Sequence, residues 1–229
     1  MSVFTTYLQL GFLHICSWQA TDHLTFLLAL CAPYVLADWR RVVALVTSFT
    51  VGHSITLALA TLGDVWMNSS IKEYVNYIDL IIHFSSVGNY IGNILPGGSI
   101  VEALIPITII LTALVNMKQA SPALAQPSRC EAPVLWAAPN ALAAVFGLIH
   151  GLGFSNYLRE LLGNQSRPVA ELLSFNLGVE LGQLLVVSGI LLLGFVLLRV
   201  VGVARRDWIL TVSGAALGVA TLLLLQMRA

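Results

Sequence analysis

Long apolar stretches constrain this chain more than any other feature, because about six of them are long enough to cross a lipid bilayer. A spanning helix needs about 20 predominantly apolar residues. Stretches of this kind lie at roughly 22–37, 42–62, 99–117, 134–158, 169–198 and 208–225. Charged residues make up 10% of the 229 residues, whereas a soluble domain carries about 25%. The sequence therefore predicts an all-α membrane protein, with residues 1–229 forming one bundle of about six transmembrane helices.

Two further segments are too interrupted to be predicted as simple spans. Residues 3–20 (VFTTYLQLGFLHICSWQA) are apolar with aromatic and polar interruptions, which favours an interfacial or re-entrant helix; a seventh span is the alternative. Residues 71–95 are amphipathic and include His83, so an interfacial helix is predicted there.

A polar, proline-containing segment near 118–133 is predicted to be a cytoplasmic linker between two three-helix halves. Halves with an odd number of spans have opposite topologies, as in transporters built from inverted repeats. The sequence similarity between the two halves is limited to GFLH at 11–14 and GLIH at 147–150, which is too short to establish a repeat.

The distribution of Lys and Arg predicts the orientation, since these residues favour cytoplasmic loops. Placing the turn at 38–41 inside puts most of the 11 basic residues inside, namely Arg40, Arg41, Lys118, Arg129, Arg199, Arg205 and Arg206. Both chain termini are then predicted to lie outside.

Ionisable side chains lie within several of the apolar stretches. Such groups are costly at bilayer depth, so they usually face the bundle interior and form an ion, proton or substrate site. Counting along each helix at about 1.5 Å per residue places them between the outer surface and the midplane, where they can converge. The predicted ligands of one site are His14, Asp22, His23, His53, His150 and Glu180. A second tier of candidates consists of Glu102, Asn176, Gln183 and Cys16.

Several of these residues also fit a simpler role when taken alone. Asp22 fits a helix cap and His53 fits an interhelical hydrogen-bond donor. Cys16 fits a small buried residue, because the three cysteines are too few and scattered for a disulfide framework. Asn116, near the end of its span, is predicted to be solvated.

The combination of imidazole and carboxylate indicates the class of ligand. It suits first-row divalent transition ions, whereas carboxylate alone would suit Mg²⁺, Ca²⁺ or Mn²⁺. The residues therefore predict a site for Ni, Zn, Cu, Fe or Co, without a choice among them. The net charge of +0 argues against nucleic acid as a partner.

Five runs of the sequence resemble the HupE/UreJ family of bacterial membrane proteins. They are HICSWQATDHLTFLLAL, LVTSFTVGHSITLALA, VEALIPITIILTALVN, FGLIHGLGFS and SFNLGVELGQL, and the resemblance extends from Gly11 to about residue 195. Members resemble nickel permeases that serve hydrogenase or urease maturation. The resemblance thus implies uptake of a divalent ion, nickel above all, across the bacterial inner membrane.

The resemblance also implies roles for particular residues. His14, Asp22 and His23 take the positions of the family's early metal motif, with seven residues between His14 and Asp22 where the better-known form has five. Of the later motif only His150–Gly151 remains, so the ligand set differs from that form.

Three functions fit this pattern. The first is a secondary-type permease for the metal ion, because the sequence contains no nucleotide-binding motif. The second is an intramembrane metalloenzyme, with Glu102 or Glu180 as base. The third is an accessory subunit with a structural metal, bound to a larger membrane complex or to copies of itself. In each case the predicted partners are the metal ion and the lipid bilayer.

Overall fold

The structure is a computed structural model that describes residues 2–18, 20–67, 100–120, 138–162 and 168–227, and every element within these ranges is helical. The elements are α1 (Val3–Cys16), α2 (Thr21–Cys31), a 3₁₀ turn η1 (Leu36–Asp38), α3 (Trp39–Met67), α5 (Ile100–Gln119), α6 (Ala138–Leu162), α7 (Pro168–Phe195), a π-helical extension η3 (Val196–Val201) and α8 (Arg205–Gln226). The predicted all-α class is confirmed. The segment 71–95, with His83, and most of the linker at 118–133 lie outside the described residues.

Among the described residues, four segments are long and apolar enough to cross a membrane: Leu36–Ala60, Val101–Gln119, Val169–Val201 and Arg205–Gln226. Three more helical segments are apolar but shorter, namely Val3–Cys16, Thr21–Cys31 and Ala138–Phe154. The predicted count of six or seven spans is therefore not confirmed, whereas the membrane-protein class is supported. Large apolar side chains such as Leu185 and Leu222 are about 60% exposed on the outside of the bundle, as lipid-facing residues would be.

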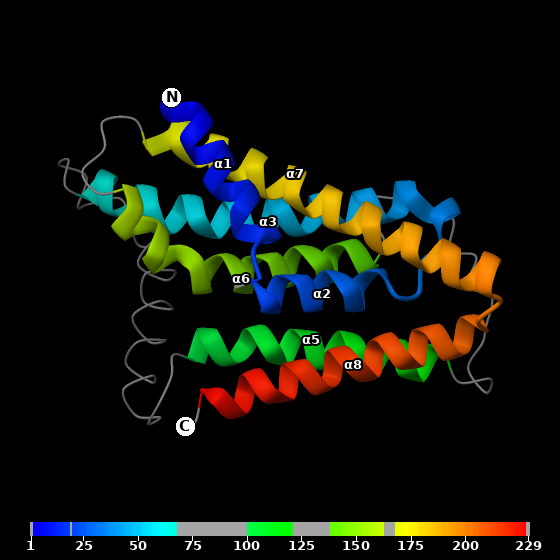
Figure 1. The fold of residues 1–229 in the computed structure, drawn as a ribbon. Coiled ribbons are helices and arrows are strands. Elements are labelled where there is room, and N and C mark those ends of the chain that lie inside the picture. The colour runs from blue at the N-terminus through cyan, green and yellow to red at the C-terminus, as the bar shows by residue number, and fades with distance from the viewer. Residues whose placement is uncertain (1, 19, 68–99, 121–137, 163–167, 228–229) are drawn as a thin grey trace.

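The predicted first span at 22–37 is wrong in its length. Helix α2 ends at Cys31, because Pro33 has no backbone N–H with which to continue the hydrogen-bond ladder. Its 11 residues extend only about 16 Å, roughly half of the hydrocarbon core. Helix α1 precedes it, and the two helices follow one another along the bundle with a break between them that lies inside the bundle (Figure 1).

Helix α2 is the centre of the packing. Leu27 and Cys31 belong to an apolar cluster with α1, α3 and α7. Phe26 and Ala29, on the other side of α2, belong to a second cluster with α3, α5, α6 and α8. The short helix is thus surrounded by the longer ones, which fixes the position of its N-terminal turn.

Glycines bring α3 and α6 into backbone contact. A Cβ added at Gly52 would lie 2.1 Å from the carbonyl oxygen of Ala144, and one added at Gly147 would lie 2.1 Å from that of Phe49. No side chain fits at either position, so the two helices approach as closely as helices can, as small residues allow in membrane bundles.

The same arrangement recurs between α1 and α7. A Cβ at Gly11 would lie 2.0 Å from the carbonyl oxygen of Phe175, and one at Gly178 would lie 2.1 Å from that of Leu8. Both pairs of helices therefore use a Phe-x-x-Gly segment on one helix (FTVG or FNLG) against a Gly-x-x-His segment on the other (GLIH or GFLH).

Within each glycine-packed pair the two helices run in the same direction, and α3 and α6 run opposite to α1 and α7 along the bundle (Figure 1). The chain ends, marked N and C, lie at the same end of it (Figure 1). The similar segments GFLH and GLIH thus make equivalent backbone contacts in the two helix pairs, as inverted repeats would.

Candidate metal site

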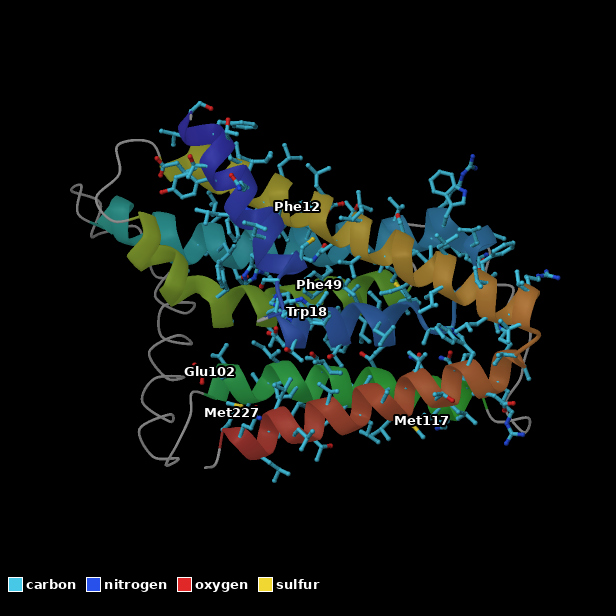
Figure 2. The ribbon with its side chains drawn as sticks, viewed as in Figure 1. Phe12, Trp18, Phe49, Glu102, Met117 and Met227 are labelled. Atoms are coloured by element: carbon cyan, nitrogen blue, oxygen red, sulfur yellow. The ribbon has the colours of Figure 1, made fainter. Side chains whose placement is uncertain are left out.

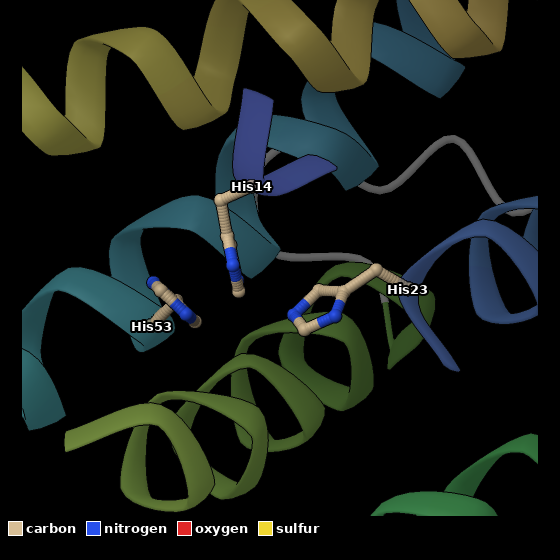
Figure 3. A group of neighbouring side chains, drawn as sticks. All are labelled: His14, His23 and His53. Carbon is tan, nitrogen blue, oxygen red and sulfur yellow. The ribbon is translucent and has the colours of Figure 1, made fainter. Parts of the chain in front are cut away.

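Four histidines from four helices come together inside the bundle. His14 lies in the last turn of α1, His23 in the first turn of α2, His53 within α3 and His150 within α6. His53 and His150 are fully buried and His23 is 4% exposed. The rings of His14, His23 and His53 point toward a common space (Figure 3), and the centroids of the His14 and His23 rings are 4.9 Å apart.

Two groups of candidate ligand atoms share His23. His14, His23 and His53 form the first, and Asp22, His23 and His150 form the second; within each group one ligand atom per residue lies within 4.8 Å of the others. A four-coordinate ion with bonds of about 2.1 Å draws its ligand nitrogens to about 3.4 Å from one another. The ligand atoms of either group would therefore have to move closer together to hold an ion.

Asp22 sets the tautomer of His23. Nδ1 of His23 lies 3.0 Å from Oδ1 of Asp22, so the ring donates its Nδ1 proton to the carboxylate. Nε2 then carries a free lone pair, and this atom is buried with no hydrogen-bond partner in the described part of the chain. A carboxylate that holds a histidine in this way orients the ring and raises its basicity as a ligand.

Thr108 of α5 sets the tautomer of His150. Its hydroxyl donates to the carbonyl oxygen of Ile105 at 2.7 Å, and a hydroxyl has only one proton to give. The contact of 3.2 Å between Thr108 Oγ1 and His150 Nε2 must therefore run the other way, with the imidazole as donor. Nδ1 of His150 is left with a free lone pair, and it too is buried without a partner among the described residues.

Replacing Thr108 with Val should weaken metal binding without unfolding the protein. Val has nearly the shape of Thr but offers no acceptor, so the His150 ring would lose the contact that fixes its tautomer. Affinity for Ni²⁺ should fall about 10–100-fold, the usual effect of removing such a partner, in isothermal titration of purified protein. Thr112→Val is the matched control, since Thr112 is also buried on α5 but, among the described residues, its hydroxyl bonds to the backbone oxygen of Thr108 and to no histidine. An equal loss in both variants would contradict the assigned role.

His14, His23 and His150 border a cavity of about 580 Å³, whereas His53 is not part of its lining. Its lining residues are Leu10, Leu13, His14, Ser17, Ala20, Asp22, His23, Glu102, Ile105, His150, Gly153, Phe154 and Phe175. Aromatic rings form the wall behind the imidazoles: the centroid of Phe154 is 4.0 Å from that of His14, and the centroid of Phe49 is 5.2 Å from that of His150. An apolar wall of this kind controls solvent access to a bound ion.

The break between α1 and α2 contributes its helix ends to the same place. The C-terminal end of α1, with His14, carries the negative end of that helix dipole, which favours a cation. The N-terminal end of α2 carries the positive end, and Asp22 in its first turn compensates for that charge.

The remaining predicted ligands are not all at this place. Glu102, exposed in the first turn of α5 (Figure 2), lines the cavity. Glu180 does not line it; one carboxylate oxygen accepts a hydrogen bond of 2.7 Å from Thr47. The expectation that all the predicted ligands line one cavity is therefore not confirmed for Glu180 or for His53, which the lining also lacks.

The other second-tier residues also lie beside the histidines rather than among them. Asn176 is next to His53, and Gln183 accepts a hydrogen bond of 2.8 Å from Thr50. Cys16 directs its thiol toward the carbonyl oxygen of Gly182 at 3.9 Å and belongs to neither group of candidate ligands.

Two buried polar residues of α5 were missed from the sequence: Thr108, which contacts His150, and Asn116, which lies outside the site. Asn116 is 5% exposed rather than solvated, and its amide donates to the carbonyl oxygen of Ala29 at 2.7 Å, which anchors α2 to α5. A signal was present, because Thr108, Thr112 and Asn116 follow one another at intervals of four residues on one face of an apolar helix.

The model of the family described as HupE / UreJ protein matches residues 1–97 and 87–228. No curated protein and no solved structure matches the chain.

Proposed function

Because the chain belongs to the HupE/UreJ family, we propose that it is a membrane permease for a divalent transition-metal ion, with Ni²⁺ as the first candidate. One observation carries the proposal: four imidazoles from four helices lie together around His23, and three of them line a cavity in a bundle that contains membrane-length helices. The family is associated with nickel and cobalt transport, which agrees with a site rich in nitrogen ligands.

The choice of ion follows from the donor atoms. Nitrogen donors outnumber the one carboxylate among the grouped ligands, so the site should prefer Ni²⁺, Co²⁺, Zn²⁺, Cu²⁺ or Fe²⁺ to Mg²⁺ or Ca²⁺. The ion is the cargo of the protein here, and the groups that hold it are His14, His23, His53 and His150 with Asp22.

The topology that suits this function has six crossings, with α1 and α2 together as a discontinuous first one. Transporters commonly place a binding site at such a break near the midplane, where helix ends face the substrate. The start of α3, the segment η3 and the start of α8 lie at the end of the bundle opposite the chain termini (Figure 1), and these parts of the chain contain Arg40, Arg41, Arg199, Arg205 and Arg206. By the positive-inside rule that end is cytoplasmic, so both termini lie outside, in a bacterial inner membrane.

A metalloenzyme is the second candidate, because Glu102 lines the same cavity as His23 and, unlike Asp22, has no hydrogen bond to an imidazole in the described part of the chain. Such a residue could act as a general base toward a metal-bound water. An accessory role in a complex, or in an oligomer of this chain, remains the third.

Flux into sealed vesicles tests the proposal. Protein reconstituted into proteoliposomes should accumulate Ni²⁺ or Co²⁺, measured by elemental analysis, well above empty liposomes and above vesicles offered Mg²⁺. Binding of the ion without accumulation in vesicles would contradict the permease and favour the enzymatic or accessory function.

A further inference from the structure

A second cavity, of about 600 Å³, lies at the end of the bundle opposite the chain termini (Figure 1). Among the described residues, it shares no lining with the cavity beside the histidines. Its volume is within the range of about 300–1,000 Å³ that small-molecule sites occupy. Three parts of the chain line it, namely residues 35–37, the end of α7 with η3 (Phe195, Leu198 and Arg199), and the start of α8 (Val203 and Arg205).

The turn between η3 and α8 brings the two arginines to this cavity. Gly202 has a φ of 84°, a left-handed conformation that glycine adopts without strain. The N–H of Val203 then donates to the carbonyl oxygen of Leu197 at 2.9 Å and closes the turn. Leu198 and Val203 pack on the buried apolar cluster that includes Trp208. The cavity wall is therefore supported by the core of the bundle.

Both arginines are exposed and have donors to offer a ligand. Nη2 of Arg205 donates to the carbonyl oxygen of Pro33 at 2.7 Å, which holds this guanidinium group beside residues 35–37. A guanidinium group has five N–H donors, so most of those of Arg205 remain available. Arg199 forms no ion pair with any residue in the described part of the chain.

Two carboxylates are close to these segments along the chain, but neither is among the described residues that line the cavity. Asp38 accepts a hydrogen bond from the N–H of Val35 and lies 4.0 Å from Arg41. Asp207 is exposed in the first turn of α8. The lining, as far as the structure describes it, thus combines apolar side chains with two positive charges.

An aromatic residue beside the cavity indicates its depth in the membrane. Trp39 follows residues 35–37 directly and is 53% exposed, and the guanidinium carbon of Arg40 lies 5.4 Å from the centroid of its ring. Exposed Trp is typical of the interface between membrane and water, and basic residues favour its cytoplasmic side. The cavity therefore lies at the level of the lipid headgroups.

We propose that this cavity binds an anionic phospholipid, with its phosphate at Arg199 and Arg205 and part of an acyl chain against Leu198 and Phe195. Arginine binds phosphate through paired, charge-assisted hydrogen bonds. The ammonium group of a zwitterionic lipid would meet no carboxylate among the described lining residues. Basic pockets between membrane helices bind acidic lipid headgroups in this way. The proposal requires a membrane protein but does not depend on the permease function.

Native mass spectrometry of the purified protein, titrated with phosphatidylglycerol or with phosphatidylcholine of the same acyl chains, tests the proposal. The wild type should bind phosphatidylglycerol more tightly. Arg199→Gln should lower that affinity about fivefold, the usual contribution of one basic residue at an anionic membrane surface, and leave phosphatidylcholine binding unchanged. Arg206→Gln is the matched control, because it removes the same charge from an exposed neighbour of Arg205 that is not in the lining.

The control should match the wild type with both lipids. An equal loss in Arg199→Gln and Arg206→Gln would overturn the proposal, since it would reflect the general surface charge. Equal affinity of the wild type for the two lipids would overturn it as well. Arg205→Gln should weaken phosphatidylglycerol binding too, but it also removes the hydrogen bond to Pro33. Thermal unfolding without lipid therefore accompanies each variant to confirm that it is folded.

A competition experiment distinguishes a lipid from a free phosphate ion. Inorganic phosphate at the concentration of the lipid should not displace phosphatidylglycerol, because burial of the acyl chain contributes to the affinity of the lipid alone. Displacement by inorganic phosphate would assign the arginines to a soluble anion and overturn the lipid site.

Discussion

Replacement of His23 with Ala is expected to abolish high-affinity metal binding and to reduce metal uptake to background. His23 is the residue common to both groups of candidate ligands, so its loss leaves neither group complete. His14→Ala and His150→Ala each leave one group intact. These two substitutions should lower the affinity for the metal ion by about 10–100-fold, the usual effect of losing a partner of a ligand. The loss of affinity in His23→Ala should exceed about 100-fold.

The folded state should survive this substitution, since an interhelical polar contact in a membrane contributes only about 0.6–2 kcal/mol. Isothermal titration with Ni²⁺ and vesicle uptake measure the effect, and thermal unfolding in detergent confirms folding. His83→Ala is the matched control, because His83 is predicted from the sequence to be interfacial. Retention of wild-type affinity by His23→Ala would remove the histidine site as the binding site.

The convergence of the histidines could be predicted because polar groups in apolar helices have few favourable positions. A histidine such as His53, within a stretch of Val, Leu and Ile, must face the bundle interior. Counting residues along the helix then gives its depth, and His14, His23, His53 and His150 do lie together.

The position of Glu180 could not be predicted by counting residues along its helix. Depth along a helix gives only the axial coordinate and assumes that every helix is parallel to the membrane normal. Helix α7 is inclined to α3 (Figure 1), and it pairs Glu180 with Thr47 rather than with His53. A tilt of this kind depends on packing with neighbouring helices, which no single segment specifies.

The helix break at the site was only partly visible in the sequence. The polar interruptions of residues 3–20 indicated a segment that does not simply span, and Pro33 marked a stop. The prediction nevertheless extended the next helix to residue 37, because apolar residues continue past the proline. The sequence does not reveal that the other helices surround α2. This packing holds a helix of only 11 residues in place although it is too short to cross the membrane.

Replacement of Gly147 or Gly11 with Ala is expected to be strongly destabilising for the addition of a single methyl group. The added Cβ would lie 2.1 Å or 2.0 Å from a carbonyl oxygen of the facing helix, and a backbone atom cannot rotate away as a side chain can. The helices must separate, which disrupts backbone contact along the whole pair. Overpacking typically costs about 1–3 kcal/mol and occasionally more, and these positions should lie at or above the top of that range.

Thermal unfolding in detergent measures the effect, and Tm should fall by about 10 °C, given roughly 2–4 °C per kcal/mol for a chain of this size. Gly189→Ala and Gly218→Ala are the matched controls, since a Cβ at either position meets nothing within 4 Å. Both controls should raise stability slightly, by about 0.5–1 kcal/mol, because Ala favours a helix over Gly. Similar losses at Gly11 and Gly147 would also support their equivalence in the two helix pairs. A variant at either position as stable as the controls would show that the backbone contact there is not required.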